Sequence, residues 1–147
     1  MLRQGPISLT LHAAAEPLLA ALFIAAPFLF GFSDQGAPTA VAIVVGIGLL
    51  VVAMSTMWRL SLIKVIPVPA HMVIDLGLAA LLVASPFLFG FSDKTTPTAF
   101  FIVMGVVHLL AALGTRWAPA SGPGDGEARR RGRLRRRRGV SGSRPTG

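Results

Sequence analysis

Two histidine–acid pairs stand out in this chain as groups able to move a proton or hold a cation. His12 precedes Glu16 by four positions, and His71 precedes Asp75 by the same spacing. On a helix, this spacing places an imidazole and a carboxylate on one face, close enough to hydrogen-bond or to share a proton. If the two helices meet, the four groups could relay protons or bind a divalent metal. We therefore treat all four as a candidate proton or ligand site.

The rest of the chain gives no sign of an enzyme. The sequence contains no P-loop, zinc-protease helix, dinucleotide fingerprint or catalytic-triad spacing. It has no cysteine, which removes disulfides and thiolate metal sites together. We predict no catalytic residue, no enzymatic activity and no cofactor, and the sequence by itself assigns no metal.

Both pairs belong to a longer internal repeat. Residues 12–58 recur without a gap as residues 71–117, at a constant offset of 59, and 24 of the 47 aligned pairs are identical by direct count. Trp58 corresponds to Trp117, and the octapeptide at 27–34 corresponds to the one at 86–93. A period this long, with two apolar stretches in each copy, predicts two versions of one membrane hairpin.

Four apolar segments carry the repeat, at roughly 12–32, 38–58, 71–91 and 97–117. About 21 residues at 1.5 Å each span roughly the 30 Å hydrocarbon core of a bilayer. The polar links between the members of each pair are short enough to force antiparallel helices. The composition, 53% hydrophobic, is too apolar for an ordinary soluble domain. We therefore predict an all-α membrane protein with four transmembrane helices in two tandem two-helix hairpins.

The expected segments are an N-terminus at 1–11, hairpins at 12–58 and 71–117, a linker at 59–70 and a tail at 118–147. Pro67 and Pro69 stop a helix from running through the linker. Pro38 and Pro97 suit helix starts, where no backbone donor is needed, and Thr96 is the expected cap before Pro97.

The basic residues predict an orientation. Of 14 lysines and arginines, 13 lie on the side of the termini and the linker, and only Lys94 lies on the other side. Cytoplasmic loops carry the excess of basic residues, so both termini are expected inside, with the chain in a cell membrane. Trp58 and Trp117 are expected to end the second helix of each copy at the inner interface, a depth that tryptophan favours.

Nine of the basic residues lie between Arg129 and Arg144, in a segment with almost nothing apolar to bury. We expect a disordered tail that is attracted to anionic lipid. The arginines concerned are Arg129, Arg130, Arg131, Arg133, Arg135, Arg136, Arg137 and Arg138. Nucleic acid is not an expected partner, because no aromatic residue interleaves with the arginines to stack on bases. The main partner is the lipid bilayer, and a homo-oligomer remains open.

The octapeptide of each copy contains a proline near the expected end of its helix, which favours a kink because it removes one backbone hydrogen bond. Its first positions read Ala26-Pro27-Phe28 in one copy and Ser85-Pro86-Phe87 in the other, and a Leu-Phe-Gly-Phe exit follows each. These motifs, together with His71 and Asp75, resemble the SPW repeat membrane proteins, whose hairpin repeat carries Ser-Pro-Trp. Here phenylalanine replaces tryptophan twice and alanine replaces serine once.

The resemblance covers about residues 10–117 and leaves the arginine tail outside. It implies a multi-pass bacterial membrane protein without an established activity. It therefore supports the predicted architecture and supplies no mechanism.

A further histidine, His108, lies near the middle of the fourth apolar segment, where the first copy has Leu49. A lone histidine inside a membrane helix more often bonds a neighbouring backbone group or hydroxyl than binds a ligand. It is the weaker candidate.

Two classes of function remain open. The sequence favours the first, a structural or interaction module of the membrane, because polar residues in the second turn of a helix can simply hold the hairpins in register. The alternative is a small transporter or proton-linked channel that uses the paired histidines and acids. If the four side chains converge, transport or metal binding is favoured; if they face lipid headgroups separately, the structural module is favoured.

Overall fold

The computed structural model describes residues 5–117, which form four helices. These are α1 (Leu9–Leu29), α2 (Gly36–Ser55), α3 (Val68–Leu88) and α4 (Thr95–Gly114). All four are long and apolar enough to cross a membrane. Apart from two isolated β-bridges, the described part of the chain contains no strand pairing. The predicted all-α membrane fold is confirmed, whereas the predicted arginine tail lies outside the described residues.

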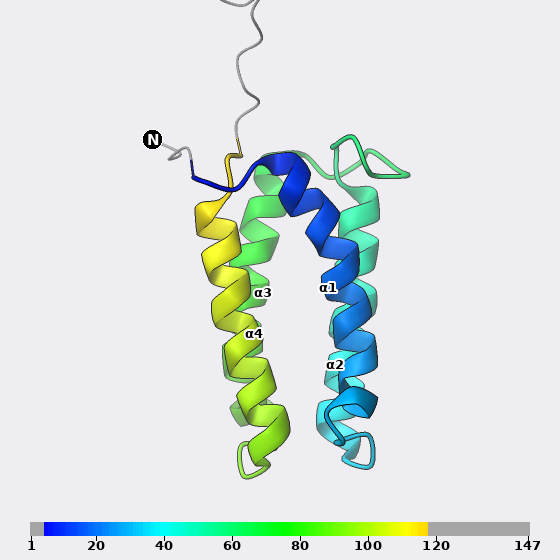
Figure 1. Cartoon of the computed structure of the whole chain (residues 1–147), viewed down its shortest axis with the longest axis vertical. Coiled ribbons are helices and arrows are strands. Elements are labelled where there is room, and N and C mark those ends of the chain that lie inside the picture. Colours follow the sequence, from blue (N-terminus) through cyan, green and yellow to red (C-terminus); the bar gives the residue numbers. More distant parts are fainter. Residues whose placement is uncertain (1–4, 118–147) are drawn as a thin grey trace, which may run out of the picture. The chain divides into compact units, whose positions relative to one another are not determined.

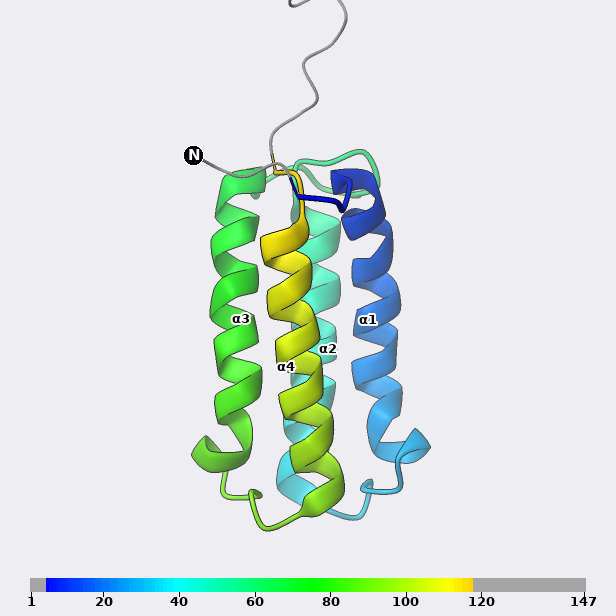
Figure 2. The ribbon, with the colours of Figure 1, turned by 60° about the vertical axis from the view of Figure 1, so that its left-hand side comes forward.

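The helices form two antiparallel pairs, α1 with α2 and α3 with α4 (Figures 1 and 2). Every helix bound of the first pair recurs 59 residues later, so α1 and α3 have 21 residues each and α2 and α4 have 20. We call α1–α2 hairpin 1 and α3–α4 hairpin 2. The end of the bundle with the links 30–35 and 89–94 is called the loop end, and the opposite end is called the site end.

The helices begin earlier than the apolar segments suggested. Ser8 caps α1, because its Oγ accepts a hydrogen bond from the Leu11 backbone N–H at 3.2 Å. The prediction that Thr96 caps a helix is wrong. Lys94 holds the cap position of α4 without a side-chain bond, and Thr96 lies in the first turn. The backbone N–H at the third position of a helix has no acceptor within the helix, so a proline, which lacks this N–H, fits there. Pro97 therefore allows α4 to start two residues before it.

The octapeptides make the turns at the loop end. Pro27 and Pro86 lie inside α1 and α3, and the chain then reverses at Gly31 and Gly90 with φ angles of 68° and 67°. Glycine adopts this left-handed conformation without the steric cost of a Cβ atom. The turns bury the rings of two residues, Phe32 and Phe91, and leave two others, Phe28 and Phe87, 68% and 66% exposed. The motif residues therefore lie at the opposite end from the histidine–acid pairs.

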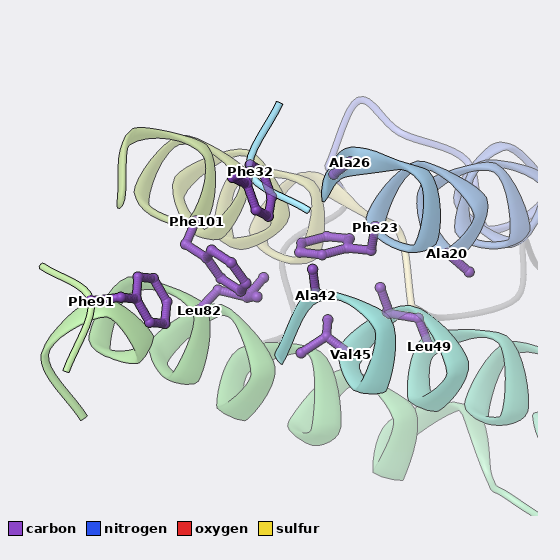
Figure 3. Close-up of a cluster of buried hydrophobic side chains, with 10 residues drawn as sticks. All are labelled: Ala20, Phe23, Ala26, Phe32, Ala42, Val45, Leu49, Leu82, Phe91 and Phe101. Atoms are coloured by element: carbon purple, nitrogen blue, oxygen red, sulfur yellow. The ribbon is translucent and has the colours of Figure 1, made fainter. Parts of the chain in front are cut away.

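An apolar core fills the bundle toward the loop end (Figure 3). Phe23 of hairpin 1 contacts two rings of hairpin 2, with centroid distances of 5.2 Å to Phe100 and 6.1 Å to Phe101. Positions 100 and 101 correspond to Val41 and Ala42 in hairpin 1, so hairpin 2 supplies the larger side chains. The two hairpins thus meet through an aromatic core in this half of the bundle.

Candidate cation site

The four predicted site residues come together at the site end. His12 and His71 are the fourth residues of α1 and α3, and the acids follow one turn further into the bundle. The exposed fractions of His12, Glu16, His71 and Asp75 are 5, 2, 0 and 0%. One ligand atom from each residue lies within 4.8 Å of the others. We call these residues the His–acid quartet, and their convergence is the arrangement that the sequence analysis associates with transport or metal binding.

Each imidazole of the quartet faces the acid of its own hairpin and the acid of the other. His12 Nε2 lies 3.3 Å from Glu16 Oε1 and 3.1 Å from Asp75 Oδ2. His71 Nε2 lies 3.2 Å from Asp75 Oδ1 and 3.7 Å from Glu16 Oε2. The quartet therefore makes polar contacts between the two hairpins as well as within each one.

Two threonines fix the imidazole rings. Thr56 and Thr115 are the first residues after α2 and α4, and their Oγ1 atoms lie 2.8 Å from His71 Nδ1 and 3.0 Å from His12 Nδ1. Each hydroxyl also donates its hydrogen to the carbonyl four residues back, at 2.7 Å in both cases. A hydroxyl has one hydrogen, so each threonine oxygen must accept from the Nδ1–H of its histidine. In the neutral ring, Nε2 is then a lone-pair donor that faces the carboxylates.

Short backbone pairings hold these threonines in place. Thr115 bridges Ile7, just before α1, and Thr56 bridges Ile66, just before α3. In Figures 1 and 2 the segment that leads into α1 passes the end of α4 accordingly. Sequence reasoning missed the threonines, although they are an identical pair at the repeat offset.

The tryptophans close the site end. Trp58 packs against His71 with a centroid distance of 4.4 Å and its ring tilted by 59°, and Trp117 lies 4.9 Å from His12. Each indole N–H donates to a carbonyl near the end of the preceding helix, at 2.9 Å for Trp58 and 2.8 Å for Trp117. The expectation that they end their helices is wrong, because α2 and α4 stop three residues earlier. The chain then turns inward and buries both rings against the histidines.

His108 adds a third imidazole on one side only. Its Nε2 lies 3.5 Å from Asp75 Oδ1, and the side chain is 2% exposed. The predicted role as a partner for a backbone group or hydroxyl does not describe this nitrogen, which makes no hydrogen bond and faces the carboxylate instead. Leu49 holds the equivalent position in hairpin 1.

Several buried polar atoms of the site have no hydrogen-bond partner among the described residues. They are Nε2 of all three histidines, Glu16 Oε2 and both carboxylate oxygens of Asp75. Within residues 5–117, the ionic partners of Glu16 and Asp75 are all histidines, with no lysine or arginine. Two buried carboxylates therefore need positive charge from protonated imidazoles or from a bound cation.

Apolar groups surround the quartet on its other sides. The aromatic core lies toward the loop end, and an apolar cavity of about 270 Å³ reaches Asp75 from the groove between α2 and α3. Leu49, Ile74 and Leu78 are among its lining residues. The site is thus closed to polar solvent in this conformation.

A comparison with protein families places this site inside a matching family model. The family model described as SPW repeat domain matches residues 10–115, a range that includes the quartet and both threonines. No curated protein and no solved structure matches the chain.

Proposed function

We propose that this chain, which belongs to the SPW repeat domain family and is a multi-pass membrane protein, is a small transporter whose substrate is a cation held by the His–acid quartet. One observation carries the proposal: four ionisable side chains from two hairpins converge in a buried site that lacks a fixed basic partner among the described residues. Ionisable groups cost about 2.5–3.5 kcal/mol each at the centre of a membrane helix, and less toward a helix end, where the quartet lies. Where they occur inside a bundle they generally mark an ion or substrate pathway.

The position of the site between two similar hairpins supports this function. In transporters with internal repeats, the substrate lies at the repeat interface, and access alternates as one repeat rocks against the other. Each hairpin packs tightly within itself, since a Cβ at Gly46 would lie 2.8 Å from the Ala20 carbonyl oxygen and one at Gly105 would lie 3.1 Å from that of Ala79. A hairpin packed at this distance can move as a unit. The conformation described above is then the closed state.

We further propose that the site end faces the cytoplasm in a cell membrane. Arg59, Lys64 and Arg116 follow the helices at this end, whereas Lys94 lies at the loop end. The positive-inside bias supports this orientation. Anionic lipid is the proposed partner of the arginine-rich segment, because clustered arginines next to a membrane attract it. We also propose that the protein is not an enzyme, because its sequence contains none of the catalytic motifs named above.

A structural module is the second candidate, favoured by the bonds that cross between the hairpins. His12 bonds Thr115 of hairpin 2, and His71 bonds Thr56 of hairpin 1. On this interpretation the quartet clamps the hairpins in register and moves no ion. The structural module is the interpretation that the isolated sequence favoured, and the convergence of the quartet now favours transport.

Flux measurements separate the two candidates. The full-length protein in proteoliposomes is supplied with protons, K⁺, Mg²⁺, Mn²⁺ or Zn²⁺ and compared with the double variant E16Q/D75N. We expect cation flux in the parent and none in the variant, because the amides keep the shape of the acids and remove their charge. The control is D34N/D93N, which makes the same change at two exposed acids of the loop end, also 59 residues apart.

Folding is checked by helix content and elution volume in detergent. A folded parent that moves none of these cations would overturn the transporter and support the clamp. Flux that survives in the folded E16Q/D75N variant would remove the quartet from the pathway.

A further inference from the structure

We infer that the His–acid quartet is a site for a divalent transition metal, with His12 Nε2, His71 Nε2 and the carboxylates of Glu16 and Asp75 as its ligands. The inference rests on the proposed function and names the substrate class of the same site. It also revises the expectation from sequence, which assigned no metal. The reason is that the decisive features are the directions of lone pairs, which appear only in three dimensions.

The spacing of the ligand atoms fits a four-coordinate ion. Zinc bonds of about 2.0–2.1 Å to imidazole nitrogen and about 2.0–2.2 Å to carboxylate oxygen place tetrahedral ligand atoms about 3.4 Å apart. The four nitrogen–oxygen distances across the quartet are 3.1, 3.2, 3.3 and 3.7 Å, and they run to both oxygens of each carboxylate. One ligand atom from each residue lies within 4.8 Å of the others. The four groups therefore surround one point, and their side chains would have to draw in to reach tetrahedral spacing.

The orientation of the imidazoles suits a metal. Both Nε2 atoms face carboxylate oxygens at 3.1–3.7 Å, where protonated rings would form ion pairs and neutral rings would share a bound cation with the acids. Their opposite nitrogens donate to Thr56 and Thr115. Histidine ligands of metals almost always donate their other N–H in this way, which fixes the tautomer and the ring. The threonines thus supply the outer shell that a metal site requires.

The chemistry of the donors selects the class of ion. Sites for Mg²⁺ and Ca²⁺ use oxygen ligands throughout, whereas imidazole suits zinc, copper, iron and nickel. Two imidazoles with two carboxylates match the ligand types and number of a zinc site. The charge also balances, because two carboxylates neutralise one divalent ion in a region with no lysine or arginine partner among the described residues. A monovalent ion would leave one negative charge buried.

The experiment is a metal titration of the full-length protein in detergent after chelator treatment. We expect one Zn²⁺ per chain by calorimetry, and with Co²⁺ the intense visible absorption of a tetrahedral complex. The paramagnetic Co²⁺ should also quench the fluorescence of Trp58 and Trp117, whose rings lie 4.4–6.1 Å from the two histidines. This second readout needs no variant.

The matched variants are H12A/H71A and the control D34N/D93N. We expect the first pair to lose Zn²⁺ affinity by more than the roughly 10–100-fold typical of outer-shell changes, and the control to bind like the parent. The inference is overturned if the folded parent binds no stoichiometric Zn²⁺, if Mg²⁺ binds as tightly as Zn²⁺, or if the folded H12A/H71A variant retains parental affinity. Proton flux without metal binding would reject the metal and leave the transporter standing. Zn²⁺ binding without any flux would reject the transporter and leave the metal site standing.

Discussion

Hairpin 1 and hairpin 2 carry the same polar framework around different apolar fillings. A histidine and an acid begin each hairpin, and a threonine and a tryptophan end it, always 59 residues apart. Farther from the site end, the two hairpins differ at equivalent positions. Hairpin 1 has Val41 and Ala42 where hairpin 2 has two phenylalanines, and it has Leu49 where hairpin 2 has His108. A site shared between two halves constrains both halves alike, whereas a core needs only to be filled. The large rings of one hairpin can therefore compensate for the small side chains of the other.

The largest expected effect breaks this compensation in the core. Phe101 is fully buried against Phe23, and Ala42 holds the equivalent place in hairpin 1. We expect Phe101→Ala to lower the free energy of unfolding by about 3–5 kcal/mol through the cavity it leaves. Ala42→Phe should cost about 1–3 kcal/mol through overpacking. Unfolding by denaturing detergent measures both. Equal stability of F101A and the parent would contradict the proposed filling.

The next effect tests whether the framework is equivalent in the two hairpins. Thr56→Val and Thr115→Val each remove the hydroxyl that fixes one imidazole and keep the side-chain volume. We expect each to weaken Zn²⁺ binding by roughly 10–100-fold, and by similar factors, because outer-shell partners typically contribute this much. Calorimetric titration measures the two constants. A loss confined to one of them would show that the halves of the site are not equivalent.

A smaller effect comes from the imidazole that only hairpin 2 possesses. His108→Leu makes the two hairpins alike at this position, and leucine already fits the equivalent place as Leu49. We expect the fold to survive and Zn²⁺ affinity to fall by less than about 10-fold, because His108 contacts Asp75 without belonging to the quartet. The same titration measures it. A fall beyond about 100-fold would make His108 a ligand, since it would exceed an outer-shell contribution.

The smallest effect concerns the exposed rings of the motif. Phe28→Ala and Phe87→Ala remove side chains that are 68% and 66% exposed at the loop end. We expect both to change the free energy of unfolding by no more than about 0.5 kcal/mol. The thermal midpoint in detergent measures this. A clear loss of stability together with a smaller particle on size exclusion would instead identify these rings as a contact between copies of the chain.

Much of the fold was accessible from the sequence because the lipid environment limits the possibilities. Four apolar stretches of membrane-spanning length and two short links leave little choice beyond two helical hairpins. The quartet was accessible for a similar reason, since a spacing of four fixes which face of a helix a residue occupies. Its convergence depended on how the hairpins meet, which no local pattern states.

Most of the parts that were missed or wrong lie at or just beyond helix ends, and the partner of His108 in the middle of α4 is the exception. Thr56, Thr115 and the two tryptophans take their roles from hydrogen bonds formed after the helix has stopped. The stopping points of α2 and α4 depend on the backbone pairing with Ile66 and Ile7, and the second of these spans more than a hundred residues. Local propensity places helix ends only to within a few residues. A difference of this size decides whether each tryptophan ends its helix at the membrane interface or folds back to cover the site.

The pairing of His12 with Thr115 also has a consequence for biosynthesis. The two residues are 103 positions apart, so a ribosome adding about 5–20 residues per second needs roughly 5–20 s to make the second after the first. For the first 59 residues of that interval hairpin 1 has Glu16 but neither His71 nor Asp75, and the ring-fixing hydroxyl of Thr115 comes last. The nascent hairpin must then keep one acid near the headgroups or under the protection of the insertion machinery until its partner emerges. Completion of the site thus marks the moment at which the chain no longer needs that protection.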